Sequence, residues 1–316
     1  MLTAHVDIEV LTDAKKRFEL DPYSRPRDFI DLVNKNSHLV WYGDPSEDEY
    51  RLLSQMLAGR GDSLIKHGIE PTCADKVPDQ KDPFQLFFAS RANYTEETES
   101  GFFTSSLDNY EDKFNELIKN SYLRLGDPES DSKFKNWKEL DSDIFVSDVI
   151  LVDTYAVSAA DENILENNLY SLARLFKAKD TLRSFLIFTR KPGLKDKDKN
   201  IPLFKIVQKL REILGTKVTT GVIYFEKFSN EHDRHLIMNY RYINAGNSFS
   251  SVYDANGSVI TKNASTISIL PLTDLVSFRK MKEILSLMKK SLDAYHEKTP
   301  GAQKIKSRLF YCLEKP

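Results

Sequence analysis

Segments with the pattern of β-strands alternate with segments with the pattern of α-helices in the second half of this 316-residue chain. Few folds are compatible with that order. Apolar, β-branched runs at residues 145–157, 184–189 and 218–226 are typical of buried strands. Helical spacing separates these runs at residues 162–177 and 202–214, and the second helix begins at a proline. The alternation predicts an α/β domain whose mixed or largely parallel sheet is flanked by helices.

The same half of the chain predicts further elements and the place of a ligand site. Residues 236–243, 266–270 and 308–313 are expected to be strands, and residues 277–296 have the spacing of a long amphipathic helix. In sheets with parallel strands, ligands bind beyond the carboxyl ends of the strands. We therefore expect a functional site at that edge of the sheet.

A polar stretch rich in turn-forming residues divides the chain. It begins at Asp127 and predicts a linker at residues 126–140. Domains of ~100–200 residues are usual, so two domains fit a chain of this length. We expect an N-terminal domain at residues 1–125, smaller and of α/β or mainly α type, and a C-terminal domain at residues 141–316.

The N-terminal domain has weaker patterns. Helical spacing predicts helices at residues 27–35 and 109–125, and a short apolar run predicts a strand at residues 37–43. Another helix is expected at Ser46, because Ser46 and Glu49 have the spacing of a capping box. Acids at this helix start could hold a metal, but we prefer the favourable helix dipole as their explanation: Asp44, Glu47, Asp48 and Glu49.

The composition is that of a globular protein, with 41% hydrophobic and 29% charged residues. No run of ~18 apolar residues predicts a membrane helix, and the first residues lack the basic and apolar regions of a signal peptide. Cys73 and Cys312 are the only cysteines, too few for a disulfide framework or a zinc cluster. We expect a cytoplasmic protein with no membrane partner, no cofactor and no metal.

Charge is distributed unevenly along the chain, although the net charge is only −2. Residues 1–130 hold 15 basic and 25 acidic side chains, whereas the remaining residues hold 30 basic and 22 acidic ones. A basic half attracts polyanions such as nucleic acid, and an acidic half repels them. The acidic half could also mask the basic one, and the alternative is a solvated surface on which the charges average out.

Two of the six histidines lie in a polar and basic segment, at His232 and His235. His232 and Arg234 are two residues apart, so on a strand both side chains point to one face. An arginine binds phosphate oxygens through paired hydrogen bonds, and a histidine can attack phosphorus or transfer a proton. The other four histidines have no evident partner and are interpreted as core or surface residues: His5, His38, His67 and His296.

Residues after this pair continue the candidate phosphate site. Gly246 would allow close approach of the backbone, and Ser248 could donate a further hydrogen bond. The alternative interpretation is an edge strand with solvated polar side chains, followed by a loop.

The segment resembles the motif of the phospholipase D superfamily, His-x-Lys-x4-Asp-x6-Gly-Ser. His232 takes the place of the histidine, Arg234 that of the lysine and Asn239 that of the aspartate, and Gly246 and Asn247-Ser248 follow at the family's spacing. Val152-Asp153-Thr154-Tyr155, at the end of the first strand, also resembles the family's Asp-x-Tyr. The resemblance covers roughly residues 140–316 and implies a phospholipase D-like fold for them.

The resemblance also implies roles for residues. In the family the histidine forms a phospho-enzyme intermediate, the lysine binds phosphate and the aspartate orients the histidine. It therefore implies His232, Arg234 and Asn239 as catalytic residues, and it implies a phosphate-binding set of Arg234, Gly246, Asn247 and Ser248. Asn239 cannot stabilise a charged imidazolium as a carboxylate would. Residues 1–230 contain no second motif, so a complete site would need a second copy of the chain.

Two functional hypotheses follow. The first is a degenerate module that binds nucleic acid or a protein partner without catalysis, in the microbial defence or mobile-element setting that the resemblance suggests. The second is an active phosphodiesterase or nuclease that works as a homodimer through the histidine nucleophile.

Aromatic and basic side chains near the motif are also candidates for contact with nucleic acid. Tyr240, Arg241 and Tyr242 could stack bases and bind backbone, although alternating aromatics on a strand more often pack in a core. The long helix at residues 277–296 has a basic face that could follow a phosphate backbone or be solvated: Arg279, Lys280, Lys282, Lys289 and Lys290.

Overall fold

The chain forms two compact units in the computed structural model. The model describes residues 1–20, 26–43, 45–56, 64–66, 82–90, 102–125, 134–141, 144–158, 161–177, 179, 181–191, 200–225, 234–246, 248–260, 265–300 and 304–314. The first unit takes in Met1–Lys119, Asp143–Phe145 and Pro271–Arg279. The second takes in Asn120–Ser142, Val146–Leu270 and Lys280–Pro316. Each unit is built from a β-sheet and helices, as expected for the α/β class.

Five parallel strands form the sheet of the first unit, in the order β3-β2-β1-β4-β5. Strand β2 confirms the strand predicted at residues 37–43, whereas the other four lie where the sequence patterns predicted no element. The strands are β1 (Leu2–Asp7), β2 (Ser37–Tyr42), β3 (Leu64–Lys66), β4 (Gln85–Ala89) and β5 (Phe103–Ser106).

Aromatic side chains pack the helices of this unit onto its sheet. Phe29 meets Phe88 of β4 at a ring-centroid distance of 4.9 Å and Phe114 at 5.5 Å, both edge-on. This contact places two helices on one face of the sheet, since Phe29 belongs to α2 and Phe114 to α5. The helical segments are α1 (Ile8–Leu20), α2 (Pro26–Asp31), a π-helical turn η1 (Leu32–Asn36), α3 (Glu47–Met56) and α5 (Tyr110–Ile118).

The predicted capping box at the start of α3 is confirmed. The backbone N–H of Ser46 donates to Glu49 Oε2 at 2.9 Å, and the N–H of Glu49 donates to Ser46 Oγ at 3.4 Å. These bonds from Ser46 lower the pKa of Glu49. They satisfy donors that the first turn of a helix leaves open.

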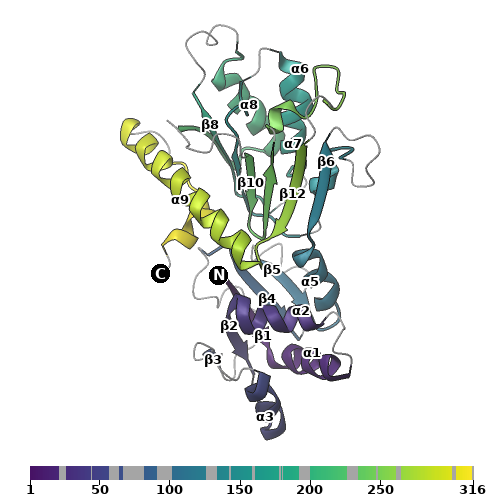
Figure 1. Ribbon diagram of the computed structural model, residues 1–316. Coiled ribbons are helices and arrows are strands. Elements are labelled where there is room, and N and C mark those ends of the chain that lie inside the picture. The colour runs from purple at the N-terminus through teal and green to yellow at the C-terminus, as the bar shows by residue number, and fades with distance from the viewer. Residues whose placement is uncertain are drawn as a thin grey trace. The chain divides into compact units, whose positions relative to one another are not determined.

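Seven strands form the mixed sheet of the second unit, in the order β6-β12-β11-β10-β7-β8-β9 (Figure 1). β7, β8 and β9 run parallel, whereas β10 is antiparallel to both β7 and β11, and β12 is antiparallel to β6. The strands are β6 (Ser121–Leu125), β7 (Asp148–Val152), β8 (Ser184–Arg190), β9 (Thr219–Phe225), β10 (Arg234–Met238), β11 (Arg241–Ala245) and β12 (Ser265–Pro271).

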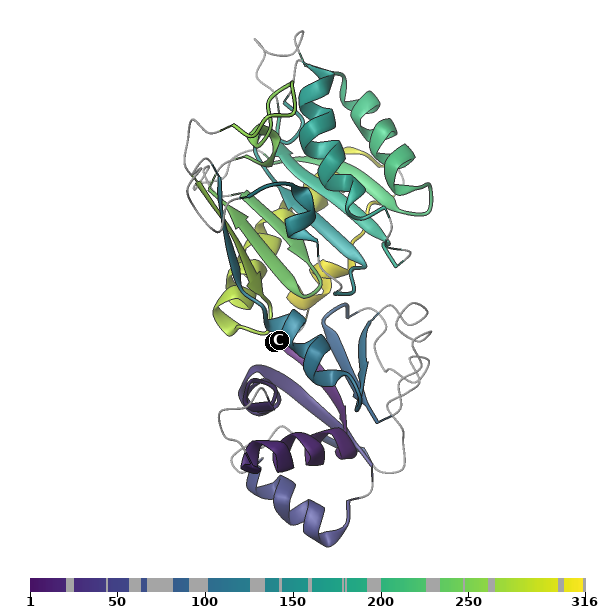
Figure 2. The same cartoon turned by 90° about the vertical axis from the view of Figure 1, so that its right-hand side faces the viewer.

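Helices cover both faces of this sheet. The helical run of residues 162–174 and α8 lie on one face and α9 on the other (Figure 2). The core under the first layer contains Leu151, Ile187 and Leu210, all buried. The helical segments are α6 (Glu162–Leu165), a π-helical turn η4 (Glu166–Tyr170), α7 (Ser171–Arg174), α8 (Leu203–Leu214) and α9 (Leu275–Lys298).

Three predicted elements have a different structure. The strand predicted at residues 236–243 is two strands, because β10 and β11 turn at Asn239-Tyr240 and pair with each other. The strand predicted at residues 308–313 is a 3-10 helix, η7 (Arg308–Leu313), whose start is capped by the Ser307 side chain. The helix predicted at residues 109–125 ends at Ile118, and residues 121–125 of the predicted range form strand β6 of the second sheet.

The stretch predicted as a linker at residues 126–140 is partly built into the second unit. Residues 126–133 lie outside the described part of the chain. Phe134, Trp137 and Leu140 are buried in the core of that unit, and residues 137–140 form the 3-10 helix η3 (Trp137–Leu140). Burial of these large side chains explains why a polar-looking segment is ordered against the sheet.

A buried ion pair holds η7 against the amino end of β7. Arg308 Nε lies 3.1 Å from Asp148 Oδ2, and the Arg308 backbone N–H lies 3.2 Å from Oδ1. The Ser184 hydroxyl donates to the same Oδ1 at 2.7 Å. Asp148 is 1% exposed and the Arg308 side chain 17% exposed, so loss of either partner would leave a poorly solvated charge.

We predict that Arg308→Met destabilises the second unit by about 3 kcal/mol, because the buried carboxylate of Asp148 would lose the cation that forms an ion pair with it. Hydrogen exchange at the amides of β7 and η7, together with thermal unfolding, measures the loss. Lys306→Met is the matched control, since Lys306 is an exposed cation of the same segment. Equal behaviour of the two variants would show that the ion pair does not hold η7 in place.

Candidate functional site

The β10–β11 hairpin brings the two ends of the motif-like segment together. Arg234, the first residue of β10, is the register partner of Ala245, the last residue of β11. Gly246 and Ser248 follow β11 and therefore come close to the Arg234 end of the hairpin. Asn239 forms the turn at the other end, about 16 Å from Arg234 at ~3.3 Å per strand residue.

Asp153 is the group on which these side chains converge. It directly follows β7, and its carboxylate accepts hydrogen bonds from the Ser248 hydroxyl at 2.8 Å and 2.7 Å. It also accepts from the backbone N–H groups of Phe249, at 2.6 Å, and Tyr155, at 2.9 Å. Arg234 Nε lies 3.4 Å from the carboxylate, and the Arg234 guanidinium carbon lies 5.5 Å from the centre of the Tyr155 ring. Asp153 thus connects the ends of β7, β10 and β11.

Burial decides how this cluster behaves electrostatically. The side chain of Asp153 is 0% exposed and that of Arg234 is 6% exposed. Burial raises the pKa of Asp153, while the hydrogen bonds from Tyr155, Ser248 and Phe249 and the charge of Arg234 act in the opposite direction. The positive charge of Arg234 is therefore balanced by a carboxylate and shielded from solvent. This geometry does not favour phosphate binding at Arg234 or Ser248.

Asn239, expected in the place of the orienting aspartate, contacts the amino end of β7. Its Oδ1 accepts hydrogen bonds from the N–H groups of Ser147 at 2.9 Å and Asp148 at 3.1 Å, and its Nδ2 donates to the Ser147 hydroxyl at 3.0 Å. The structure thus separates Asn239 from Arg234 and uses it to hold the hairpin turn against β7.

Three other residues of the predicted site are Gly246, His232 and Asn247. A Cβ on Gly246 would lie 3.6 Å from Ser265, an ordinary contact, so the structure shows no close approach that requires glycine there. His232 and Asn247 lie outside the described residues. Their roles as nucleophile and phosphate ligand stay predictions.

Aromatic residues near the motif pack in the core. Tyr240 and Tyr242 are 1% and 0% exposed, which agrees with the packing interpretation and leaves no surface for stacking bases. The Tyr242 hydroxyl lies 2.8 Å from Nδ1 of the buried His235. His235 is therefore a core histidine of the hairpin.

One histidine without an evident partner in the sequence has two in the structure. His5 Nδ1 lies 2.7 Å from the Tyr42 hydroxyl, and Nε2 lies 2.9 Å from Gln85 Oε1. The ring stacks on Phe87 at 4.5 Å. Burial raises the pKa of Tyr42 to about 12. Pairing of β1 with β2 and β4 creates this contact, which spacing along the sequence could not show.

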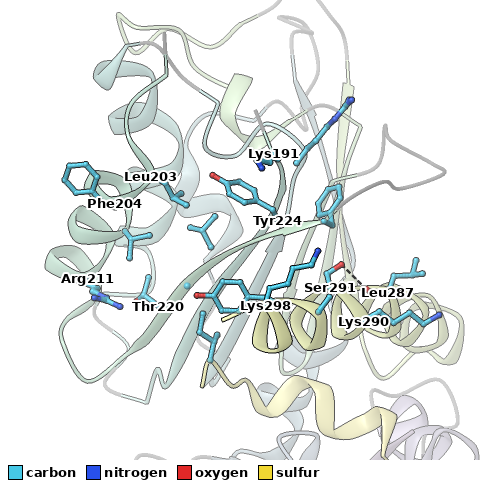
Figure 3. Close-up of a pocket in the computed structure, with 18 of the residues that line it drawn as sticks. Lys191, Leu203, Phe204, Arg211, Thr220, Tyr224, Leu287, Lys290, Ser291 and Lys298 are labelled. Atoms are coloured by element: carbon cyan, nitrogen blue, oxygen red, sulfur yellow. Dashed lines mark hydrogen bonds between the residues drawn. The ribbon is translucent and has the colours of Figure 1, made fainter. Parts of the chain in front are cut away.

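A large groove surrounds edge strand β9 in the second unit (Figure 3). Its volume is about 1460 Å³, and its walls come from the end of β8, from most of β9, from α8, from α9 and from Ile305. Tyr224 of β9 lies in the middle of the groove between Leu203 and Lys298 (Figure 3). A Cβ on Gly221 would lie 2.7 Å from Ile305 Cδ1, so the absence of a side chain at Gly221 lets the C-terminal segment pack closely on β9.

The groove is lined by cations and by no acidic residue of the described part of the chain. The cations come from three separate elements and are exposed: Arg190, Lys191, Arg211, Lys290 and Lys298. Among the described residues, no carboxylate forms an ion pair with Arg190, Lys191, Arg211 or Lys290. Because no described acid lines the groove beside these exposed cations, the groove is a region of positive potential.

Sequence patterns identified only fragments of this groove. Lys290 belongs to the basic helix face predicted at residues 277–296, whereas Lys191 directly follows β8. Arg211 and Tyr224 carried no signal of their own, because a single cation on a helix or an aromatic on a strand is common. Only the packing of α8 and α9 beside β9 places them around one space.

Neither metal binding nor membrane insertion is indicated by the described residues. They contain no group of three His, Cys, Asp or Glu side chains placed to hold a metal ion. Their helices are too short or too polar to cross a bilayer.

Comparisons with protein-family models, with curated proteins and with solved structures found no match. The phospholipase D-like resemblance therefore stays a prediction from the motif-like segment.

We predict that Asp153→Asn destabilises the second unit by about 3–5 kcal/mol, the usual cost of removing one partner of a buried ion pair. Denaturant unfolding, followed by hydrogen exchange at the amides of β10 and β11, measures this change. Asp293→Asn on the surface of α9 is the control and should change stability by less than ~0.5 kcal/mol. A stable Asp153→Asn variant would mean that the cluster is not needed to hold the hairpin.

Proposed function

We propose that this chain binds nucleic acid through the basic groove around β9, without cleaving it. The observation that carries the proposal is the set of five exposed cations around one groove that no described acid lines. A nucleic acid presents regularly spaced phosphates, and cations on several elements can contact successive phosphates. The excess of basic residues after residue 130 supports the same partner.

The size of the groove also supports an extended ligand. Small-molecule pockets are usually ~300–1,000 Å³, whereas this groove measures about 1460 Å³ and is open along the edge of the sheet. The groove runs along β9 from Thr220 to Phe225 and includes Arg190 at the carboxyl end of β8.

Binding without cleavage is supported by the state of the motif-like segment. Arg234 pairs with Asp153 in the interior, and Asn239 lies at the other end of the hairpin. The two residues that take the places of the family's phosphate ligand and orienting group therefore do not meet in one site. The alternative, a homodimeric nuclease, would need a second copy to replace them.

We predict that Arg211→Gln weakens binding of an oligonucleotide and lowers the slope of log affinity against log salt by about 1, because one phosphate contact is lost. Fluorescence anisotropy at several salt concentrations measures both quantities. Lys205→Gln is the matched control, an exposed cation of the same helix that does not line the groove. Equal slopes for the two variants, or no binding by the unaltered chain at low salt, would contradict the proposed groove.

We predict that a labelled oligonucleotide stays intact when it is incubated with the unaltered chain, with or without divalent cations, and that His232→Ala changes neither its integrity nor its affinity. Denaturing gel electrophoresis and anisotropy measure these outcomes. Cleavage by the unaltered chain that disappears in His232→Ala would favour the homodimeric nuclease instead.

A further inference from the structure

Tyr224 occupies the junction of two cavities in the second unit. It lines the basic groove and also an adjoining recess of about 280 Å³. The recess is mainly apolar, with Val157, Ile201 and Ile206 among its walls. The Tyr224 ring is partly exposed, and no described residue hydrogen-bonds its hydroxyl. An aromatic face thus separates a cationic channel from an apolar one.

We propose that the groove selects single-stranded nucleic acid by stacking an unpaired base on Tyr224, with the base directed into the apolar recess. This inference rests on the proposed function and names the form of nucleic acid that the groove takes. Lys191 lines both cavities, so it can contact the phosphate next to the stacked base. Stacking on an aromatic ring tolerates any base, and selection would therefore depend on strandedness rather than on sequence.

A duplex would use only part of this site. Its phosphates could meet the cations, but its bases are paired and stacked inside the helix, so Tyr224 and the recess would have no ligand group to contact. Filling the recess from a duplex would require a base to be unpaired and unstacked, at a cost of a few kcal/mol. A single strand has its bases available and avoids most of that cost.

An acidic protein segment is a weaker fit to the same surface. It could pair with the edge of β9 and place carboxylates near the cations. The protein segment would then also need an aromatic or other planar side chain at the position that faces Tyr224 and the recess. Every nucleotide carries both a phosphate and a flat base, so a nucleic acid satisfies both cavities with each repeat.

The test compares three ligands of about 12 nucleotides, within the ~4–16 nucleotides that single-strand sites usually span. They are a thymidine strand, the same strand with abasic sugars, and a duplex. We expect the unaltered chain to bind the thymidine strand roughly 5- to 150-fold more tightly than the abasic strand. This factor corresponds to the stacking free energy of one base, ~1–3 kcal/mol. The abasic strand keeps every phosphate, so it isolates the role of the bases without altering the protein.

Protein variants provide the second arm. Tyr224→Leu should bind the thymidine strand more weakly by a similar factor and should bind the abasic strand with unchanged affinity. Tyr224→Phe should have the affinities of the unaltered chain. The salt dependence should be the same for all three proteins, because no cation has changed. Thermal unfolding of each variant verifies that the unit is folded.

The outcomes separate this inference from the proposed function. Equal affinities for the thymidine strand, the abasic strand and the duplex would overturn single-strand selection while leaving nucleic-acid binding in place. Absence of binding to all three at low salt would overturn both. Tighter binding of polyglutamate than of the thymidine strand would overturn both in favour of an acidic protein partner.

Discussion

Two buried carboxylates, one at each end of strand β7, impose the arrangement on which the second unit depends. Asp148 at the amino end meets Arg308, and Asp153 after the carboxyl end meets Arg234. Because a buried charge without a partner costs several kcal/mol, each carboxylate stabilises the packing of a segment distant in the sequence against β7. β7 also joins the parallel strands to the antiparallel ones, so both parts of the sheet are held against the same strand.

The pairing at Asp153 also determines where a polyanion could bind. An arginine beside a buried carboxylate adds little net charge to the surface, so Arg234 contributes structure to the hairpin. The exposed cations lie instead around β9, three positions from β10 in the order of the sheet. The segment that resembles a phosphodiester motif and the surface proposed to meet nucleic acid are therefore different parts of one sheet.

Sequence patterns predicted the elements whose periodicity reflects burial along a single segment. The strand expected at residues 184–189 is β8 (Ser184–Arg190), and the helix expected at residues 202–214 is α8 (Leu203–Leu214). Sequence patterns gave wrong elements where pairing between residues distant in the sequence determines the structure. Leu236 and Ile243, the ends of one predicted strand, are register partners across a hairpin. For the same reason, the sequence singled out the segment at residues 232–249 and also Asp153, but it could not show that Arg234 and Asp153 pair in the core.

The contact between Gly221 and Ile305 has a consequence for the groove. Ile305 is both a wall of the groove and a close neighbour of Arg308, whose side chain holds the C-terminal segment to Asp148. A molecule seated against that wall would favour the docked form of the segment over a detached one. By thermodynamic reciprocity, whatever loosens the segment would weaken the hold on the molecule by the same free energy. A molecule at the sheet edge and the attachment of η7 would then be linked through one equilibrium.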